Sequence, residues 1–558
     1  MLPLGLHLRD RLAGQPDRTV ATYVALDGQA RPLSARELSA RAQAVNAALR
    51  HLGLGDRSLV AIVHRSGPWL HAAWLGTLWA GHVPTVIAPP SPRMEPRKYA
   101  EGFAGMVGHL GLDAVILDDG TQAALGGLMP AGTPWLATDS LQPTDEAVPI
   151  DERAGLDDEV AVQHTSGTTG LQKAVGFTSR QLHVHAGALL QRLEATPQDV
   201  VVSWLPLYHD MGFIACFVTP LMSGLRMVEM SPFDWVQRPA LLFDAIEAHH
   251  GTLCWLPNFA FRVLVEDRVL KAAAERGRPW RLGGLRAFIN CSEPVMEEAV
   301  AAFVDRLATH GVRAGQVIAS YAMAEAIFCV TQNEIGAPRR AAVSRDALDR
   351  DGRATPRCAD AADAVTLVSC GRALPTVTLE IRDAAGQILP EGRLGQIHIA
   401  GSHVFKGYRS DATAAAIDAR GFYATGDLGF TLDGELYVTG RLKDLIIIRG
   451  RNYYPQDVEA LVGTVDGVIA GRVVAFGVPD SVTGTEKLVI LLESRPEEPT
   501  GKVVLAVRRQ IAQSLDCTAG DVRIVPPRSL VKSTAGKISR AENRRRYLET
   551  AGTGQPGH

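Results

Sequence analysis

The sequence predicts an α/β protein in two parts: a large N-terminal domain of mixed, mainly parallel sheets with flanking helices, and a small mobile α+β domain at the C-terminus. The length of 558 residues exceeds what one hydrophobic core usually serves. A hydrophobic content of 46% with 21% charged residues is ordinary for a globular protein. Short β-branched runs alternate with amphipathic segments, a pattern typical of parallel sheets covered on both faces.

The first elements follow each other at the spacing of strand, helix and strand. Leu59–Val63 is a β-branched run, a proline opens the helix predicted over Pro68–Ala80, and Val83–Ala88 is the next strand. Similar strand-like runs occur at Ala114–Leu117, Val200–Trp204, Leu253–Leu256 and Leu285–Asn290. Between Ala337 and Ala364, Arg, Asp and Ala dominate and apolar periodicity fades, so we expect a surface insertion there.

A second change in pattern comes after Arg441. The order strand, helix, strand, strand, helix is predicted over Leu445–Ile448, Pro455–Leu461, Arg472–Gly477, Leu488–Glu493 and Lys502–Leu515. We therefore place a large domain at 1–441 and a small one at 442–558, about a hundred residues long. The segment from Thr534 onward is polar and basic, and we expect its last residues to be disordered.

Charge and cysteine content exclude several classes of protein. A net charge of -3 argues against nucleic acid or an anionic membrane as the main partner. No uninterrupted apolar run reaches transmembrane length, and the N-terminus shows no secretion signal. The seven cysteines are scattered without a C-x-x-C pair, so we expect reduced thiols rather than disulfides or a zinc site. These features favour the cytoplasm.

The segment from Thr165 to Lys173 carries the clearest chemical signal. It combines hydroxyls, flexible glycines and a cation directly after a strand-like run; its members are Thr165, Ser166, Gly167, Thr168, Thr169, Gly170 and Lys173. Free backbone N–H groups, hydroxyls and a lysine together can cradle a polyphosphate. The spacing differs from that of a Walker A loop. Taken alone, the segment also fits an ordinary Ser/Thr/Gly turn.

Five further motifs follow in a fixed order. They are Leu205–Gly212, Tyr321–Ala326, Tyr423–Gly429, Gly440–Asp444 and Ser533–Lys537. Together with the glycine-rich loop they resemble the adenylate-forming superfamily, which comprises acyl-CoA synthetases, adenylation domains of peptide synthetases and luciferases. The resemblance covers nearly the whole chain. It implies a large domain that binds ATP and an acid, and a small domain that carries a catalytic lysine.

Within this superfamily the chain is most similar to the fatty acyl-AMP ligases. Their style of motif appears in Trp204–Gly212, Asn290–Val295, Val368–Arg372 and Lys443–Asp457. The resemblance implies transfer of the acyl group to the phosphopantetheine arm of an acyl carrier protein rather than to free coenzyme A. Glu325 and Gly371 are 46 positions apart, more than coenzyme-A ligases generally have. The extra residues coincide with the Arg/Asp/Ala-rich segment.

The resemblance assigns roles to charged and aromatic residues, and each role suits the chemistry. Attack of a carboxylate on ATP brings anions together, so catalysis depends on positioning and charge neutralisation. Lys537 is expected to neutralise charge at the reacting oxygens, and Glu325 to hold Mg²⁺. Tyr321 would face adenine, and Asp427 would accept the ribose hydroxyls.

Three further roles follow from the same resemblance. Arg441 would contact the ribose or phosphate, Lys443 would be the interdomain hinge, and His209 would line or gate the acyl tunnel. Each of the assigned residues also has an ordinary structural alternative, such as a solvated surface charge, a turn aspartate, a core tyrosine or a satisfied buried histidine.

The chain departs from the family pattern at three positions. Ala174 and Ala322 stand where glycine is usual, and Cys291 replaces a glycine beside the expected adenine and acyl walls. A bulkier residue at this last position would shorten or bend the acyl pocket. None of the three changes removes a charged group.

The leading hypothesis is an enzyme that activates a fatty or other hydrophobic acid as acyl-AMP and loads a carrier protein. One alternative is an acyl-CoA synthetase that uses free coenzyme A. A second is an amino-acid adenylation protein, for which Asp210 is the nearby candidate to bind the substrate ammonium. A third, a non-catalytic nucleotide-binding protein, does not explain why Lys173, Glu325, Asp427 and Lys537 occur together.

Overall fold

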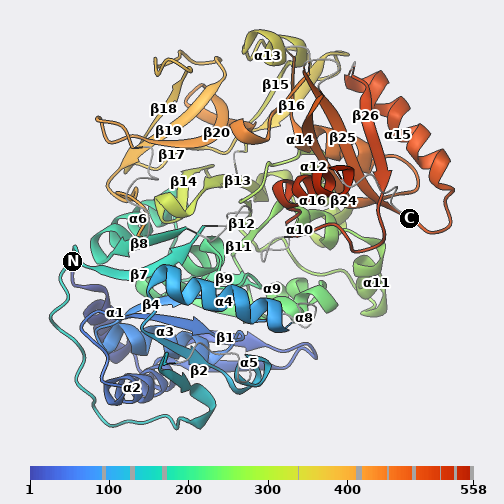
Figure 1. Cartoon of the computed structure of the whole chain (residues 1–558). Helices are drawn as coiled ribbons and strands as arrows, with labels where there is room; N and C mark the ends of the chain where they lie inside the picture. Colours follow the sequence, from blue (N-terminus) through green and yellow to red (C-terminus); the bar gives the residue numbers. More distant parts are fainter. Residues whose placement is uncertain are drawn as a thin grey trace.

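The computed structural model describes residues 1–90, 96–125, 132–165, 173–336, 338–409, 417–448, 451–480, 485–515, 517–532 and 537–552. Within this part of the chain, two large sheets lie in the N-terminal two thirds and smaller sheets follow toward the C-terminus (Figure 1). The alternation of strand and helix predicted from the sequence is confirmed. No helix among the described residues is both long and apolar enough to cross a membrane.

The first large sheet has six strands and is parallel except at one edge. Its order is β6 (Trp135–Ala137), β5 (Ala114–Leu117), β3 (Leu59–Val63), β4 (Val83–Val86), β7 (Glu159–His164) and β8 (Ala174–Thr178). The β7–β8 pair is antiparallel, with His164 opposite Ala174. Thr165 and Lys173, the two ends of the glycine-rich motif, therefore lie together at one end of the sheet.

The second large sheet has nine strands. Its order is β17 (Arg372–Ala373), β14 (Cys329–Gln332), β13 (Val317–Ala322), β12 (Ala287–Asn290), β11 (Leu253–Leu256), β9 (Val200–Ser203), β10 (Arg226–Met230), β1 (Thr19–Val24) and β2 (Ala30–Ser34). The central pairs from β1 to β13 are parallel. Because the carboxyl ends of parallel strands meet at one edge, the loops after β9, β12 and β13 are brought together.

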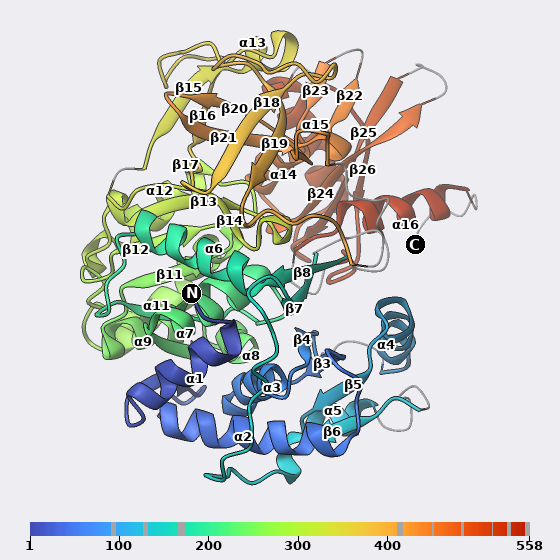
Figure 2. The same cartoon turned by 90° about the vertical axis from the view of Figure 1, so that its left-hand side faces the viewer.

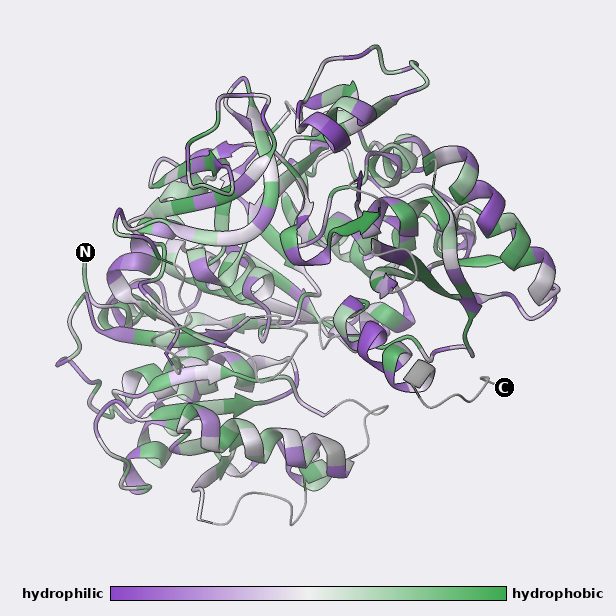
Figure 3. Ribbon diagram, turned by 45° about the horizontal axis from the view of Figure 1, so that its top comes forward, coloured by the Kyte–Doolittle hydropathy of each residue, from purple (hydrophilic) through white to green (hydrophobic). Residues whose placement is uncertain are grey.

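Helices cover these two sheets (Figure 2). They include α1 (Leu4–Gly14), α2 (Ala35–His51), α3 (Pro68–Trp79), α4 (Pro96–Leu110), α6 (Ser179–Arg192), α9 (Leu241–His249), α10 (Asn258–Leu264), α11 (Asp267–Glu275) and α12 (Glu297–Leu307). Helix α3 is apolar on every side and is buried from Leu70 to Trp79, whereas capping boxes at Ser34 and Thr178 start α2 and α6. In Figure 3 many outer helices alternate between purple and green residues, as amphipathic helices do.

The expected surface insertion is a folded unit. Strands β15 (Arg340–Ser344) and β16 (Ala364–Val368) pair in antiparallel fashion, and α13 (Arg345–Asp351) lies between them in sequence. Val343 and Leu348 are buried in a small core that also contains Phe430 and Tyr437. These elements are too short to produce a visible apolar period, so the sequence showed only a polar composition.

A four-stranded antiparallel sheet precedes the C-terminal small domain. It contains β18 (Val377–Arg382), β19 (Gly395–Gly401), β20 (Tyr423–Leu432) and β21 (Glu435–Arg441). The short 3-10 turn η7 (Leu442–Asp444) then leads into the small domain.

The C-terminal small domain has its own hydrophobic clusters. It consists of β22 (Ile446–Ile448), β23 (Arg451–Tyr453), α14 (Pro455–Gly463), β24 (Val468–Asp480), β25 (Thr485–Ser494), α15 (Thr500–Leu515), β26 (Ala519–Ile524) and α16 (Arg540–Gly552). The strand and helix segments predicted here are confirmed. Strand β26 and helix α16 were not predicted from the sequence: β26 is six residues long with Gly, Asp and Arg among its apolar residues, and charged residues outnumber apolar ones in α16.

Candidate active site

Asp427, in the middle of β20, is the centre of a polar cluster. It is 6% exposed and lies directly opposite Arg441 in the β20–β21 pair. Tyr321, at the end of β13, donates its hydroxyl hydrogen to Asp427 Oδ2 at 2.6 Å, and Arg441 Nε donates to Oδ1 at 3.0 Å. The Asp427 carboxylate raises the pKa of Arg441, and burial raises that of Tyr321. Both partners therefore stay protonated and hold the carboxylate in place.

Glu325 lies in a second polar cluster, in the short 3-10 turn η6 (Ala324–Ala326). Its Oε1 accepts hydrogen bonds from the hydroxyls of Tyr408 at 2.6 Å and Tyr423 at 3.3 Å. The ammonium group of Lys173 lies 4.4 Å from the centre of the Tyr408 ring, a cation–π distance. The structure therefore brings Glu325 and Lys173 to the same tyrosine, although the two residues are far apart in sequence.

The base of the glycine-rich loop is closed by a backbone hydrogen bond. Thr165 N donates to the Lys173 carbonyl oxygen at 2.9 Å, next to the last pair of β7 and β8. Thr165 and Lys173 thus stand at the two ends of the loop. The other predicted members, Ser166, Gly167, Thr168, Thr169 and Gly170, lie outside the described residues.

Lys537 of the small domain reaches the large domain. Its Nζ donates to the carbonyl oxygen of Ser292, which follows β12. Ser292 has a φ of +72°, and Cys291 before it is fully buried. Burial raises the pKa of the Cys291 thiol to about 12, with a further contribution from Asp210, whereas Lys537 opposes the rise. Lys537 is therefore close to both Asp210 and the end of β12.

His209 and Asp210 form a pair beside Lys537. The two side chains approach to 2.6 Å between Nδ1 and Oδ1. Burial acts to raise the pKa of Asp210, but His209 and then Lys537 outweigh this effect and lower it. Asp210 also accepts from the Met211 backbone N–H at 2.8 Å, at the start of the π-helix η3 (Met211–Val218). Because Asp210 is already paired with His209 and the Met211 backbone N–H, it is a poor candidate for binding a substrate ammonium.

The structure thus gathers the assigned side chains into three groups. Asp427, Tyr321 and Arg441 form one, Glu325 and Lys173 a second, and Lys537 with His209 a third. Lys443 is separate from them and lies exposed in η7.

Sequence reasoning missed two kinds of contact in this region. Tyr423 belongs to a motif that had been recognised, but it received no role. Tyr408 lies in no recognised motif, so the sequence carried no signal for it. The Ser292 contact is made by a main-chain oxygen, which leaves no trace in residue type.

These three groups and their fold define an enzyme of the adenylate-forming kind, with nucleotide-binding and acid-activating parts in one molecule. A family model described as "AMP-binding enzyme" matches residues 8–409. The long-chain-fatty-acid–AMP ligase FadD26 of Mycobacterium marinum is 30% identical over 587 residues, which cover 97% of this chain and 96% of that protein.

Solved structures agree with these matches. A structure from work on the fatty acyl-adenylate ligases of E. coli and L. pneumophila superimposes with a TM-score of 0.88 at 27% identity, covering 99% of both chains. A fatty acyl-adenylate ligase from L. pneumophila in complex with acyl adenylate and pyrophosphate gives a TM-score of 0.72 at 25% identity, covering 98% of this chain and 96% of that one. The chain belongs to the AMP-binding enzyme family and is an ATP-dependent, acid-activating ligase.

Proposed function

We propose that this enzyme converts a fatty or other hydrophobic carboxylic acid to acyl-AMP and then transfers the acyl group to the phosphopantetheine thiol of a carrier protein. One observation carries the first step: Lys537 crosses from the small domain to Ser292, beside the His209–Asp210 pair. This arrangement suits adenylation, because it brings a mobile cation to the side where an acid would enter.

In the first step a carboxylate oxygen attacks the α-phosphorus of ATP. The new P–O bond forms as the bond to the β-phosphate oxygen breaks, and pyrophosphate leaves. Asp427 would hold the ribose through the lone pairs that Tyr321 and Arg441 leave free, because a carboxylate has about four acceptor sites. Thr165 and Lys173 would hold the outer phosphates. Lys537 would neutralise the charge that gathers at the α-phosphate and the attacking carboxylate.

Magnesium fits the donor set around Glu325. Mg²⁺ is usually held by one or two carboxylates, together with substrate phosphates and water, rather than by an all-protein cage. Among the described residues no group of three His, Cys, Asp or Glu side chains could hold a metal alone, whereas the Glu325 carboxylate lies near Lys173 of the phosphate loop. When bound, the ion would supply charge neutralisation at the phosphates.

Contacts between the insertion and the small domain bear on which thiol accepts the acyl group. Arg345 of α13 forms an ion pair of 2.8 Å with Asp457 of α14, and Arg451 of the small domain pairs with Asp346 at 3.0 Å. Figures 1 and 2 show α13 beside the small domain in both views. If the small domain begins at residue 442 and turns about Lys443, these pairs oppose its rotation. A carrier protein has enough surface to stabilise the rotated state, whereas free coenzyme A has much less.

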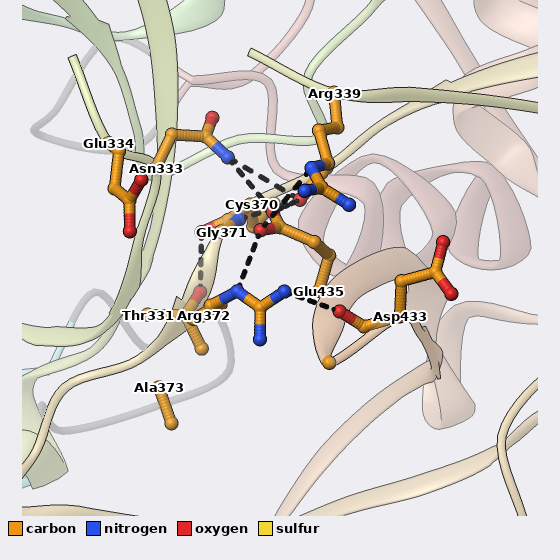
Figure 4. A network of polar contacts seen from close by, with 12 residues as sticks. Thr331, Asn333, Glu334, Arg339, Cys370, Gly371, Arg372, Ala373, Asp433 and Glu435 are labelled. Carbon is orange, nitrogen blue, oxygen red and sulfur yellow. Dashed lines mark hydrogen bonds and ion pairs between the residues drawn. The ribbon is translucent and has the colours of Figure 1, made fainter. Parts of the chain in front are cut away.

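The base of the insertion is also fixed. Glu435 of β21 accepts from Ser369 at 2.6 Å and lies 3.3 Å from Arg372 and 4.0 Å from Arg339 (Figure 4). Arg339 enters the insertion, and Ser369 and Arg372 lie just beyond its end. The insertion is therefore tied to the large domain at both ends, which supports a rigid restraint rather than a loose loop.

The test has two stages. Pyrophosphate release from ATP is measured with each acid of a panel of carboxylic acids. If no acid causes release, acid activation is contradicted. With an accepted acid, we expect acyl-AMP to accumulate in the presence of free coenzyme A and to be consumed by holo-carrier protein. Turnover of coenzyme A as fast as adenylate forms would favour an acyl-CoA synthetase. Excision of about residues 337–364 should raise acyl-CoA formation.

A further inference from the structure

We propose that the acid activated by this enzyme carries a hydroxyl group toward its far end, and that Glu229 recognises this hydroxyl. The inference deepens the proposed function and rests on it. Glu229 of β10 is 9% exposed, and its Oε1, which solvent does not reach, has no hydrogen-bond partner among the residues that the structure describes. A buried carboxylate oxygen without a donor is unfavourable, so a site that retains one calls for a ligand that supplies the donor.

Only one side of the Glu229 carboxylate is occupied. His71 Nε2 of α3 lies 3.1 Å from Oε2, and the other ring nitrogen, Nδ1, lies 2.7 Å from the Tyr23 hydroxyl. Burial and then the Glu229 charge raise the pKa of Tyr23 well above its ordinary value. Tyr23 therefore keeps its proton and can donate it to Nδ1, which leaves the hydrogen on Nε2 to face Glu229. His71 Nε2 thus lies beside Oε2 without forming a hydrogen bond to it, and Oε1 has no donor among the described residues.

The π-helix η3 connects this cluster to the reaction centre. Its first residue follows the His209–Asp210 pair, and the Phe217 ring near its end stacks on His71 at 4.2 Å between ring centres. Cys216 lies between the two regions: burial raises the pKa of its thiol to about 12, and both Glu229 and Cys291 add to the rise. Cys291 is in turn a neighbour of Asp210 and Lys537.

The reach along η3 suits an acid of medium length. A helix rises about 1.5 Å per residue, so Met211 and Cys216 are separated by at most roughly 8 Å along the axis. π-Helical turns are rare and occur often at functional sites. An acid with its carboxylate at Lys537 and its chain along η3 would bring its far end to Glu229.

The chemistry of Glu229 Oε1 determines which group at the far end of the acid can bind to it. A carboxylate only accepts hydrogen bonds, so the matching group is a donor. A neutral hydroxyl can donate without bringing a second charge into the interior. A terminal methyl group would leave Oε1 without a partner. Sites built to bind a hydroxyl discriminate strongly against the analogue that lacks it.

The experiment compares pairs of acids of equal length, one plain and one hydroxylated near its far end, by kcat/KM for pyrophosphate release. We expect the wild-type enzyme to prefer the hydroxylated member at least roughly tenfold at one chain length. Glu229→Leu should abolish or reverse this preference. Glu275→Leu, the same substitution at an exposed position of α11, is the matched control and should leave the preference unchanged.

Several outcomes would overturn the inference. A wild-type preference for the plain acid at every length would do so, as would an equal loss on both acids in Glu229→Leu. A preference for ω-amino acids over hydroxy acids would show that the site recognises an ammonium group instead of a hydroxyl, and this result would also overturn the inference. If Glu229→Leu does not fold, the preference of the wild-type enzyme and the change in that preference in Glu229→Gln test the inference instead. If no acid causes pyrophosphate release, the proposed function itself is contradicted. If only plain acids cause release, this inference alone is contradicted.

Discussion

Lys537 makes its interdomain contact through a neutral partner. Its ammonium donates to the Ser292 carbonyl, while Asp210, whose pKa it helps to lower, is paired with His209. A lysine held by a carboxylate would lose part of its charge to that partner, whereas a carbonyl leaves the charge available for the substrate. The position therefore favours a cation that acts on the transition state.

Lys537→Ala is expected to lower the rate of acyl-adenylate formation at least roughly a hundredfold, with ATP affinity nearly unchanged. The reason is that the charge is needed mainly where negative charge develops during the reaction. Single-turnover adenylation and equilibrium ATP binding measure the two effects separately. Lys502→Ala, at an exposed position of α15, is the control. A mutant that retains more than about a tenth of the wild-type rate would contradict the assignment.

Asp427→Ala is expected to weaken ATP binding at least roughly tenfold, because ribose contacts exist before the reaction begins. Tyr321→Phe removes one donor to Asp427 and keeps the ring, so its effect on binding should be smaller. Calorimetric titration with ATP measures both affinities. An unchanged dissociation constant in Asp427→Ala would mean that the carboxylate serves only Tyr321 and Arg441.

Residue types predicted part of this site and could not predict the rest. Asp427 and Arg441 were found because both lie in ordered motifs, and the β20–β21 register then places them opposite each other. Tyr408 was missed because its hydroxyl reaches Glu325 only through the fold. Glu229 reads in sequence as one acid in an apolar run, and its buried position becomes visible only with His71 beside it.

At the scale of elements, short apolar runs predicted β3, β5 and β11 closely, because each run coincides with a buried strand. Helix α13 was missed because it has seven residues, fewer than an apolar period needs. Segment η3 is uniformly apolar, and residue pattern alone does not distinguish a π-helix from other buried helices.

Gly371 shows how tightly the exit from the insertion is packed. It has a φ of +85°, and a methyl group there would overlap the backbone of Gln332 and Asn333. Gly371→Ala should therefore lower the free energy of unfolding by more than roughly 3 kcal/mol or prevent folding.

Gly386→Ala is the matched control for this substitution. Its φ of +81° is similar, but an added methyl group meets nothing within 4 Å. Its cost should be the backbone strain alone, roughly 1–2 kcal/mol. Urea or thermal unfolding measures both variants. Equal destabilisation would show that backbone conformation, rather than close packing, explains the glycine at 371.

At the scale of the whole molecule, the proposed function predicts that the contact between α13 and the small domain governs which acceptor is used. The double variant Arg345→Ala/Asp346→Ala removes both ion pairs and should raise thioester formation with free coenzyme A relative to adenylation, by roughly threefold or more. Stopped reactions that separate acyl-AMP from acyl-CoA measure the ratio. Asp351→Ala changes an exposed residue of the same helix and should leave the ratio unaltered. An unchanged ratio in the double variant would show that these ion pairs do not determine which thiol accepts the acyl group.

Asp349 makes this contact sensitive to pH. It is 6% exposed, and burial raises its pKa to about 6; Arg345 and Arg451 oppose the rise, whereas Asp457 and Asp346 add to it. Its ordinary value is 3.8, so between about pH 4 and pH 6 the folded protein binds more protons than the unfolded chain. The contribution of this group to stability therefore falls as pH rises through that window and is constant above it.

Asp349→Asn should remove this dependence. The variant should match the wild type near pH 4 and exceed it by on the order of 2 kcal/mol above pH 6, because its amide never ionises. Scanning calorimetry at a series of pH values, with the difference in melting temperature plotted against pH, makes the comparison. A difference that is flat from pH 4 to pH 8 would contradict the raised pKa.

The π-helical form of η3 also bears on how this enzyme can diverge over evolutionary time. A π-helix closes its hydrogen bonds between residues five apart, one more than an α-helix. Loss of one codon here would restore α-helical winding and rotate every later side chain of the segment by roughly 100°. Cys216 would then turn away from Glu229 and Phe217 from His71, while Lys537 and Asp427 would be untouched. If Glu229 selects the acid as proposed, single-residue insertions and deletions here would exchange one substrate for another, and the length of this helix would record that exchange.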